Sequence, residues 1–254
     1  MASDPLISTG RVLDSFGGAA DRYNSAAGLQ QSMAWKLARN CSRLPIEKGL
    51  WVDLGSGTGC LADALEQTFP GQMILRLDGS IAMLRRQRTG TRTQLHDLSR
   101  GLPSWPERPQ LLASSFALHW LPDPALKLRQ WLEALSFGGW LAVTLPVQGS
   151  FPEWQKAADQ AGERCSALSL PERTELLSAI PSAAIQLDHC LNITQTAAHP
   201  KDLLKPMLTT GACVTQGGGL STAGWRKLFR AWPGDAETGD AMLSWRILFV
   251  ILKR

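Results

Sequence analysis

The sequence predicts an α/β fold in which strands and helices alternate around a mostly parallel sheet. Residues 50–54 form a short apolar run, and a glycine-rich turn follows at residues 55–59. Such runs are typical of central parallel strands, which are buried on both faces. Later apolar runs alternate with segments of helical periodicity, which is the pattern of βαβ units. A chain of 254 residues has room for one large domain of this class.

The expected elements follow from apolar runs, helical spacing and end signals. Asp123 followed by Pro124 is typical of a helix start, and two glycines at residues 138–139 end that helix. Five strands of βαβ type should be followed by two more. The expected strands are residues 50–54, 73–77, 93–96, 110–116, 140–147, 184–194 and 244–252. The expected helices are residues 26–41, 60–69, 80–88, 123–136, 153–165, 171–179, 201–208 and 221–232, after a first helical piece that begins near residue 11.

The long connection before the last strand is predicted to be a helical lid. About 50 residues separate the last two expected strands, and connections of that length usually have a function or structure of their own. The connection contains two helix-like segments around the glycine-rich residues 217–219. We therefore expect one domain over residues 1–254, with N-terminal helices at 11–42 and a lid insertion at about 195–243.

The glycine-rich turn predicts a site for a nucleotide-like ligand. Glycines remove side chains where a ligand must approach the backbone, and the next helix directs unpaired N–H groups at the turn. The dinucleotide fingerprint G-x-G-x-x-G does not fit, because the third glycine arrives early, at Gly59, and Cys60 stands in its place. With Asp53 two residues before Gly55, the pattern is D-x-G-x-G-x-G. This pattern resembles motif I of the class I S-adenosylmethionine-dependent methyltransferases.

Acidic residues also stand at the ends of the next two expected strands. Asp78 follows the glycine turn by roughly 20 residues, a spacing that suits a carboxylate bound to a ribose diol. Asp97 and Leu98 match the family position that brackets the adenine ring. Each feature alone has a structural explanation, since a strand-end Asp often only caps a helix, but their conjunction favours a cofactor site. The resemblance implies that S-adenosyl-L-methionine is held by Tyr23, Gln30, Asp53, Gly55, Ser56, Gly57, Asp78, Gly79, Asp97, Leu98 and Ser114.

Composition narrows the class of protein and its partners. The chain is 44% hydrophobic and 19% charged, as is ordinary for a globular protein. The five cysteines form no C-x-x-C pair and the four histidines show no ligand spacing, so we expect neither disulfides nor a metal. A net charge of +4 without a basic tail does not indicate a nucleic-acid partner. Without a secretory signal or a long apolar run, we expect a cytoplasmic monomer with no membrane contact.

Several segments carry a closer resemblance to one family. Residues 16–23 follow the pattern F-x-x-A-A-x-x-Y, and Leu29-Gln30 come after them. Residues 114–120 read SSFALHW, residues 147–150 read VQGS, and residues 205–212 are similar to L-K-x-x-G-A. These segments resemble the malonyl-acyl-carrier-protein O-methyltransferases of biotin biosynthesis. The resemblance implies a Rossmann-like, seven-stranded sheet that is mostly parallel, with an antiparallel last strand and helices on both faces.

The same resemblance implies methyl transfer to the free carboxylate of malonyl-acyl carrier protein, a transient partner, to give the ester that primes pimelate synthesis. A carboxylate is already a nucleophile at neutral pH, so the enzyme must mainly align it. A cation or neutral donors should hold its second oxygen, and the candidates are Arg22, His119 and Gln148. The sequence departs from the family at Gln110, where an acid is usual. It also has Trp245 where Tyr is common, which leaves open the substrate contacts from that strand.

Other functions stay open at this point. The chain is also compatible with a methyltransferase of the same fold that acts on a small free acid or a metabolite oxygen. A non-catalytic adenosylmethionine-binding protein is disfavoured by the intact Gly55, Gly57, Asp78 and Asp97. A nicotinamide dehydrogenase is disfavoured by Cys60.

Two groups of cations are candidates for docking an acidic carrier protein. The first group forms the end of the helix expected at residues 80–88 and continues just past it, and a solvated helix end explains this group better than docking does. The second group lies in the proposed lid. Lys201 and Lys205 are one helical turn apart, as are Arg226 and Arg230, so the two members of each pair can face the same way. The first group is Arg85, Arg86, Arg88 and Arg92, and the lid group is Lys201, Lys205, Arg226, Lys227 and Arg230.

Overall fold

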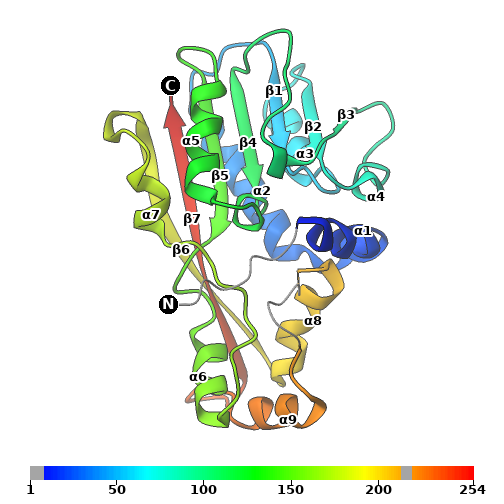
Figure 1. The fold of residues 1–254 in the computed structure, drawn as a ribbon, viewed down its shortest axis with the longest axis vertical. Helices are drawn as coiled ribbons and strands as arrows, with labels where there is room; N and C mark the ends of the chain where they lie inside the picture. Colours follow the sequence, from blue (N-terminus) through cyan, green and yellow to red (C-terminus); the bar gives the residue numbers. More distant parts are fainter. Residues whose placement is uncertain (1–8, 213–218) are drawn as a thin grey trace.

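The computed structural model describes residues 9–212 and 219–254, and its centre is a seven-stranded sheet (Figure 1). The strands lie in the order β3-β2-β1-β4-β5-β7-β6. All pairs among β1 to β5 are parallel, and β7 lies antiparallel between β5 and β6. The prediction of a mostly parallel sheet with an antiparallel last strand is confirmed. The strands are β1 (Trp51–Leu54), β2 (Ile74–Asp78), β3 (Arg92–Leu95), β4 (Leu111–Ser115), β5 (Trp140–Pro146), β6 (Ile185–Ala197) and β7 (Ala241–Lys253).

Helices cover both faces of the sheet, because the central strands are apolar on both sides. In β1, Trp51 joins the core beneath α2 and α3, while Val52 joins the core beneath α5 and α7. Trp131 of α5 is completely buried in the second core. The helices are α1 (Thr9–Ala26), α2 (Gly28–Cys41), α3 (Cys60–Thr68), α4 (Ile81–Leu84), α5 (Pro124–Ala134), α6 (Pro152–Ala161), α7 (Arg173–Ser178), α8 (Pro200–Thr210) and α9 (Thr222–Arg230). Within the described residues, no helix is long and apolar enough to cross a membrane.

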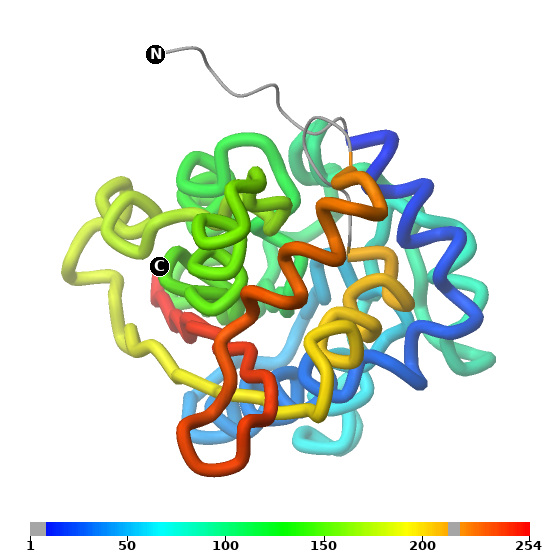
Figure 2. Tube along the Cα trace, turned by 90° about the horizontal axis from the view of Figure 1, so that it is seen from below, coloured from blue at the N-terminus to red at the C-terminus, as the bar shows by residue number. Residues whose placement is uncertain are grey.

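The strands β6 and β7 are longer than predicted. They pair with each other from Ile185 to Ala197, so both continue past the ends of the parallel strands. The helices α6, α8 and α9 lie around this extension (Figure 1). The view of the molecule from below shows that α8 also lies beside α1 (Figure 2). The connection from β6 to β7 therefore contains two helices, α8 and α9, which lie around the extended part of these two strands. Residues 217–218 of its expected glycine-rich stretch lie outside the described residues.

Two predicted helices are shorter in the structure. The segment expected to be helical over residues 80–88 contains α4, which ends at Leu84. The side chain of Gln87 bonds to the glycine turn, so a tertiary contact replaces continuation of the helix. The helix expected over residues 153–165 ends at Ala161, because Gly162 adopts a left-handed conformation with φ of 64°.

Candidate functional site

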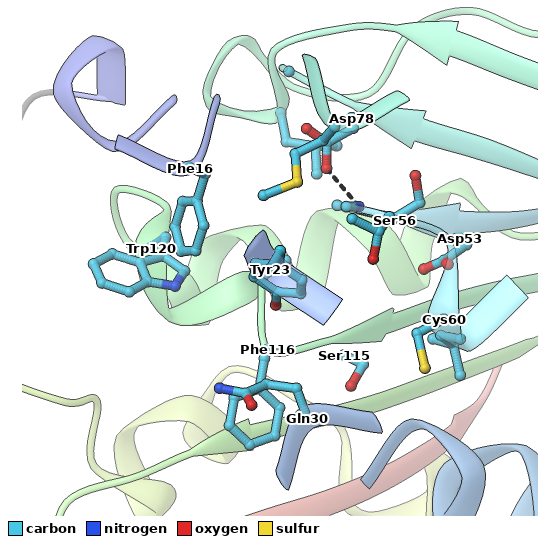
Figure 3. Close-up of a pocket in the computed structure, with 18 of the residues that line it drawn as sticks. Phe16, Tyr23, Gln30, Asp53, Ser56, Cys60, Asp78, Ser115, Phe116 and Trp120 are labelled. Atoms are coloured by element: carbon cyan, nitrogen blue, oxygen red, sulfur yellow. Dashed lines mark hydrogen bonds between the residues drawn. The ribbon is translucent and has the colours of Figure 1, made fainter. Parts of the chain in front are cut away.

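A first cavity lies at the carboxyl ends of β1, β2 and β4 (Figure 3). The strand order reverses beside β1, and open α/β sheets usually bind ligands in the crevice at such a point. The helices α1 and α2 cover this crevice. Phe16 and Tyr23 of α1 and Gln30 of α2 line it together with the glycine turn. The fold thus brings the N-terminal helices and the glycine turn into one site.

The glycine turn presents bare backbone to the first cavity. Gly55 and Gly57 have φ values of 72° and 52°, in the region that glycine adopts without strain. A Cβ atom on Gly55 would collide with Ala117, whereas one on Gly57 would meet no atom within 4 Å and would occupy open space. Gln87 holds the turn, since its Nε2 donates to Ser56 Oγ at 3.0 Å and to the Gly57 carbonyl at 2.7 Å.

Asp78 links β2 to the glycine turn. Its Oδ2 accepts a hydrogen bond from the Gly57 N–H at 2.8 Å, which Figure 3 shows, and its Oδ1 accepts one from the Ser80 N–H at 2.7 Å. Burial raises the pKa of Asp78 above its usual value, against the effect of these two bonds. Each carboxylate oxygen has further acceptor capacity, and Asp78 lines the cavity. The side chain can therefore accept hydrogen bonds from a ligand diol.

Asp53 lies beneath the start of α3. Its carboxylate accepts a hydrogen bond from the Ala62 N–H at 3.0 Å, and its Oδ1 is buried without a partner among the described residues. Burial raises the pKa of Asp53 to about 7, although the positive charge of Arg76 opposes the rise. Arg76 is itself buried and forms ion pairs with Asp63 at 2.8 Å and Glu66 at 2.7 Å. Asp53 should therefore change its charge near neutral pH.

We expect the substitution Asp53→Asn to alter how stability depends on pH. The pKa of Asp53 is about 7 in the folded chain and 3.8 for a free aspartate side chain, so the folded state binds more protons between these values. The free energy of unfolding should then fall as pH rises through that window. The asparagine variant should lack this part of the decline. Denaturant titrations of both proteins across the window test this, and identical pH profiles would contradict it.

A second cavity adjoins the first. Five side chains line both cavities and form a shared wall: Phe16, Tyr23, Gln30, Phe116 and Trp120. The Phe16 and Trp120 rings meet edge to face, with centroids 5.4 Å apart. Phe116 has a φ of 56°, which is rare for a bulky residue and is typical of functional sites. Groups bound in the two cavities would meet at this wall (Figure 3).

The rest of the second cavity comes from the region around β7, α6 and α8. Trp245 of β7 contributes its ring, while its Nε1 donates to Gln195 Oε1 at 3.0 Å. Trp154 of α6 and Met207 and Thr210 of α8 complete this side. Trp245, one of the two positions at which the sequence departs from the family that it resembles, therefore lies in the wall of the second cavity.

All but one of the predicted cofactor residues line the first cavity. The exception is Ser114, which is completely buried and donates from its hydroxyl to the Leu54 carbonyl at 2.8 Å. The neighbouring Ser115 lines the cavity instead, because successive side chains of β4 point to opposite faces. The residues that line it are Tyr23, Gln30, Asp53, Gly55, Ser56, Gly57, Asp78, Gly79, Asp97 and Leu98.

Of the three candidates for holding a substrate carboxylate, His119 and Gln148 line one open groove together, and Arg22 lies apart from both. Arg22 is exposed on α1 and lines neither cavity, since the face of the helix that carries Tyr23 covers the site. Gln148 is exposed and lines an open groove on the outer side of His119 and Trp120. Only His119 reaches the second cavity. Burial lowers the pKa of His119 to about 3, so at neutral pH it is an uncharged imidazole and supplies no cation.

Sequence reasoning missed Ser115, Trp154 and Ser166 as site residues. The alternation of side chains along β4 could have indicated Ser115, but only if it had been known which face of the strand points to the cavity. Trp154 and Ser166 line the second cavity from α6 and the segment after it, and nothing in their spacing indicates a site. Their positions depend on the packing of α6 against β7 and α9, which joins segments far apart in sequence.

The first cavity fits S-adenosylmethionine on structural grounds. A side-chain-free floor at Gly57, a strand-end carboxylate at Asp78 and a Ser115 hydroxyl without a partner among the described residues are complementary to a ribose and polar groups. Asp78 would hold the ribose diol, and Leu98 and Asp97 would lie against the adenine ring. When bound, this cofactor supplies an electrophilic methyl group on a positively charged sulfur.

Comparisons with known proteins find methyltransferases that are similar to this chain. Residues 52–143 match the family model described as a methyltransferase domain. The malonyl-acyl-carrier-protein O-methyltransferase of Alcanivorax borkumensis is 27% identical over 97% of this chain and 87% of its own length. The trans-aconitate 2-methyltransferase of Mycobacterium tuberculosis is 32% identical over 47% of this chain and 45% of its own.

A solved structure shows the same fold. The S-adenosylmethionine-dependent methyltransferase from Thermotoga maritima superposes with a TM-score of 0.51 over 94% of this chain and 99% of its own, at 16% identity. The sheet order with its antiparallel β7 and the matched domain at residues 52–143 lead to the same assignment. The chain is an S-adenosylmethionine-dependent methyltransferase of the class I fold.

Proposed function

We propose that the chain methylates the free carboxylate of malonyl-acyl carrier protein, giving the malonyl methyl ester that primes pimelate synthesis for biotin. The observation that carries the proposal is the shared wall, which sets a second cavity directly beside the predicted cofactor site. The similarity over nearly the whole chain to proteins named for this reaction supports it. That similarity includes the N-terminal helices and the connection from β6 to β7, which supply walls of the second cavity.

The geometry suits a reaction that needs alignment more than acid-base chemistry. A carboxylate is ionised and nucleophilic at neutral pH. Held in the second cavity, one of its oxygens would face the methyl group across the shared wall. Alignment of this kind is worth up to several kcal/mol. The faces of Phe16, Phe116 and Trp120 at that wall also suit a positively charged sulfur, because aromatic faces attract cations.

The helices α8 and α9 are proposed to act as a lid that also docks the carrier. Met207 and Thr210 of α8 already line the second cavity, and Ser15 of α1 donates from its hydroxyl to the Gly211 carbonyl at 2.8 Å. The lid carries exposed cations on both helices. Lys227 forms an ion pair with Glu163 at 3.2 Å, so its positive charge is already partly neutralised and attracts an acidic partner less strongly. Arg226 and Arg230 are exposed on the same helix, one turn apart.

We expect the double substitution Arg226→Glu with Arg230→Glu to raise KM for malonyl-acyl carrier protein several-fold. Exposed charge pairs contribute about 0.2 to 1 kcal/mol each, so single changes should be mild. Methylation of malonyl-coenzyme A, which lacks the carrier, should be unaffected. The control is Arg85→Glu with Arg92→Glu, which makes the same charge change at exposed positions on the other side of the site. Equal losses on both substrates would contradict docking at α9.

The test of the proposed function is a panel of acceptors with labelled S-adenosylmethionine. The panel contains malonyl-, succinyl- and acetyl-loaded carrier protein, free malonate and trans-aconitate. Trans-aconitate is included because a relative named for it is 32% identical over about half of the chain. Fastest labelling of malonyl-carrier supports the proposal. Preference for a free acid would instead support the second candidate, a methyltransferase for small carboxylic acids.

A further inference from the structure

The second cavity contains no charged side chain among the described residues that line it. Its lining includes seven aromatic rings besides that of His119, namely Phe16, Tyr23, Phe116, Trp120, Phe151, Trp154 and Trp245. Burial keeps His119 uncharged, and burial together with the nearby Asp78 carboxylate raises the pKa of Tyr23, which keeps its phenol neutral. A carboxylate that enters this cavity loses water without gaining a cation. Such a group is costly to bury unless hydrogen-bond donors replace the water.

Two neutral hydrogen-bond donors among the residues that line the second cavity lack partners. The indole Nε1 of Trp154 and the hydroxyl of Ser166 are both buried and form no hydrogen bond within the described chain. Unpaired buried donors cost free energy, and in native proteins each one calls for an explanation. An indole N–H can only donate, and a serine hydroxyl can rotate toward an acceptor. The Nδ1 of His119 is also unpartnered within the described residues, but whether it donates depends on its tautomer.

We propose that Trp154 and Ser166 bind the acyl carboxylate of the acceptor, so that neutral donors rather than a cation select for it. This inference rests on the proposed function and names the residues that give it specificity. The carboxylate oxygen that is not held by the donors is then free to face the shared wall.

The chemistry of the transfer accounts for the use of neutral donors. One carboxylate oxygen forms a bond to the methyl carbon as the carbon–sulfur bond breaks, and the electron pair of that bond stays on sulfur. An anion and a cation become two neutral products, and no proton moves. Because the negative charge shrinks toward the transition state, a group that stabilises the full anion strongly would slow the step. Neutral donors position the oxygen with less of that stabilisation than a cation would give.

The test compares binding of malonyl-loaded and acetyl-loaded carrier protein, by calorimetry in the presence of S-adenosylhomocysteine, to the wild type, Ser166→Ala and Trp154→Phe. A hydrogen bond to a charged group corresponds to roughly a tenfold to hundredfold change in Kd. Each variant should weaken binding of malonyl-carrier by about that factor and leave acetyl-carrier within about twofold. Ser166→Ala removes a single oxygen, so it decides the matter if Trp154→Phe disturbs packing.

The matched controls lose an equivalent atom elsewhere. Trp131→Phe and Thr144→Val each remove a buried polar atom that has no partner among the described residues and lies outside the second cavity, and they should leave the malonyl-to-acetyl ratio unchanged. If the ratio also survives both Ser166→Ala and Trp154→Phe, the assignment of the donors is overturned. If the wild type itself fails to prefer malonyl-carrier over acetyl-carrier, the proposed function is overturned instead.

Discussion

Gly57→Val is expected to abolish binding of S-adenosylmethionine while the chain stays folded. Gly57 has a φ of 52°, which strains a branched side chain, and a Cβ atom there would project into the open space of the first cavity. The substituted side chain would thus occupy the volume that the cofactor needs. The backbone N–H that donates to Asp78 would also be displaced. Calorimetric titration with S-adenosylmethionine measures the loss, and circular dichroism reports the fold.

The control for that experiment is Gly71→Val. Gly71 also has a positive φ, 86°, but it lies in an exposed turn and does not line the cavity. It should lose stability through the same backbone strain and keep cofactor affinity. Normal binding by the Gly57→Val protein would show that the glycine turn is not the cofactor loop.

Asp78→Ala is expected to weaken S-adenosylmethionine binding by at least tenfold. A hydrogen bond to a charged group contributes roughly 1.5 to 3 kcal/mol, and a diol can form two. The structure adds a second cause, because Asp78 accepts the N–H groups of Gly57 and Ser80 and so fixes the turn itself. The control is Asp123→Ala, which removes a carboxylate that accepts the Leu126 N–H at the start of α5, outside the first cavity. Affinity within twofold of the wild type would contradict the role of Asp78.

The sequence predicts the sheet well because its signals are local. Residues 50–54 and 73–77 are mostly apolar runs, interrupted only by Asp53 and Arg76, and they correspond to the buried strands β1 and β2. The predicted ligand residues Asp78 and Asp97 come at or just after strand ends, so chain connectivity alone places them at the first cavity. The class I order, including the antiparallel β7, followed from the family resemblance and not from periodicity.

Individual residues of the two cavities were harder to predict, because they depend on side-chain direction and on tertiary packing. On β4, the sequence does not say which face of the strand points to the cavity. Because alternate side chains face opposite sides, an error of one residue selects Ser114 in place of Ser115. On α1 the helical spacing of residues 16, 19, 20 and 23 already places Tyr23 on the buried face and Arg22 off it, so choosing Arg22 as a site residue went against the pattern. The burial that keeps His119 neutral arises from aromatic neighbours such as Phe116 and Trp120, whose approach no local pattern reports.

The central claim is that the chain places one methyl group on the free carboxylate of a malonyl thioester. The most direct measurement is intact-mass analysis of malonyl-acyl carrier protein after incubation with the enzyme and S-adenosylmethionine, before and after mild alkaline hydrolysis. We predict a gain of one methyl group that mild base removes, with acetyl-carrier unchanged in mass. An unmodified malonyl-carrier, or a methyl group that resists base, would contradict it.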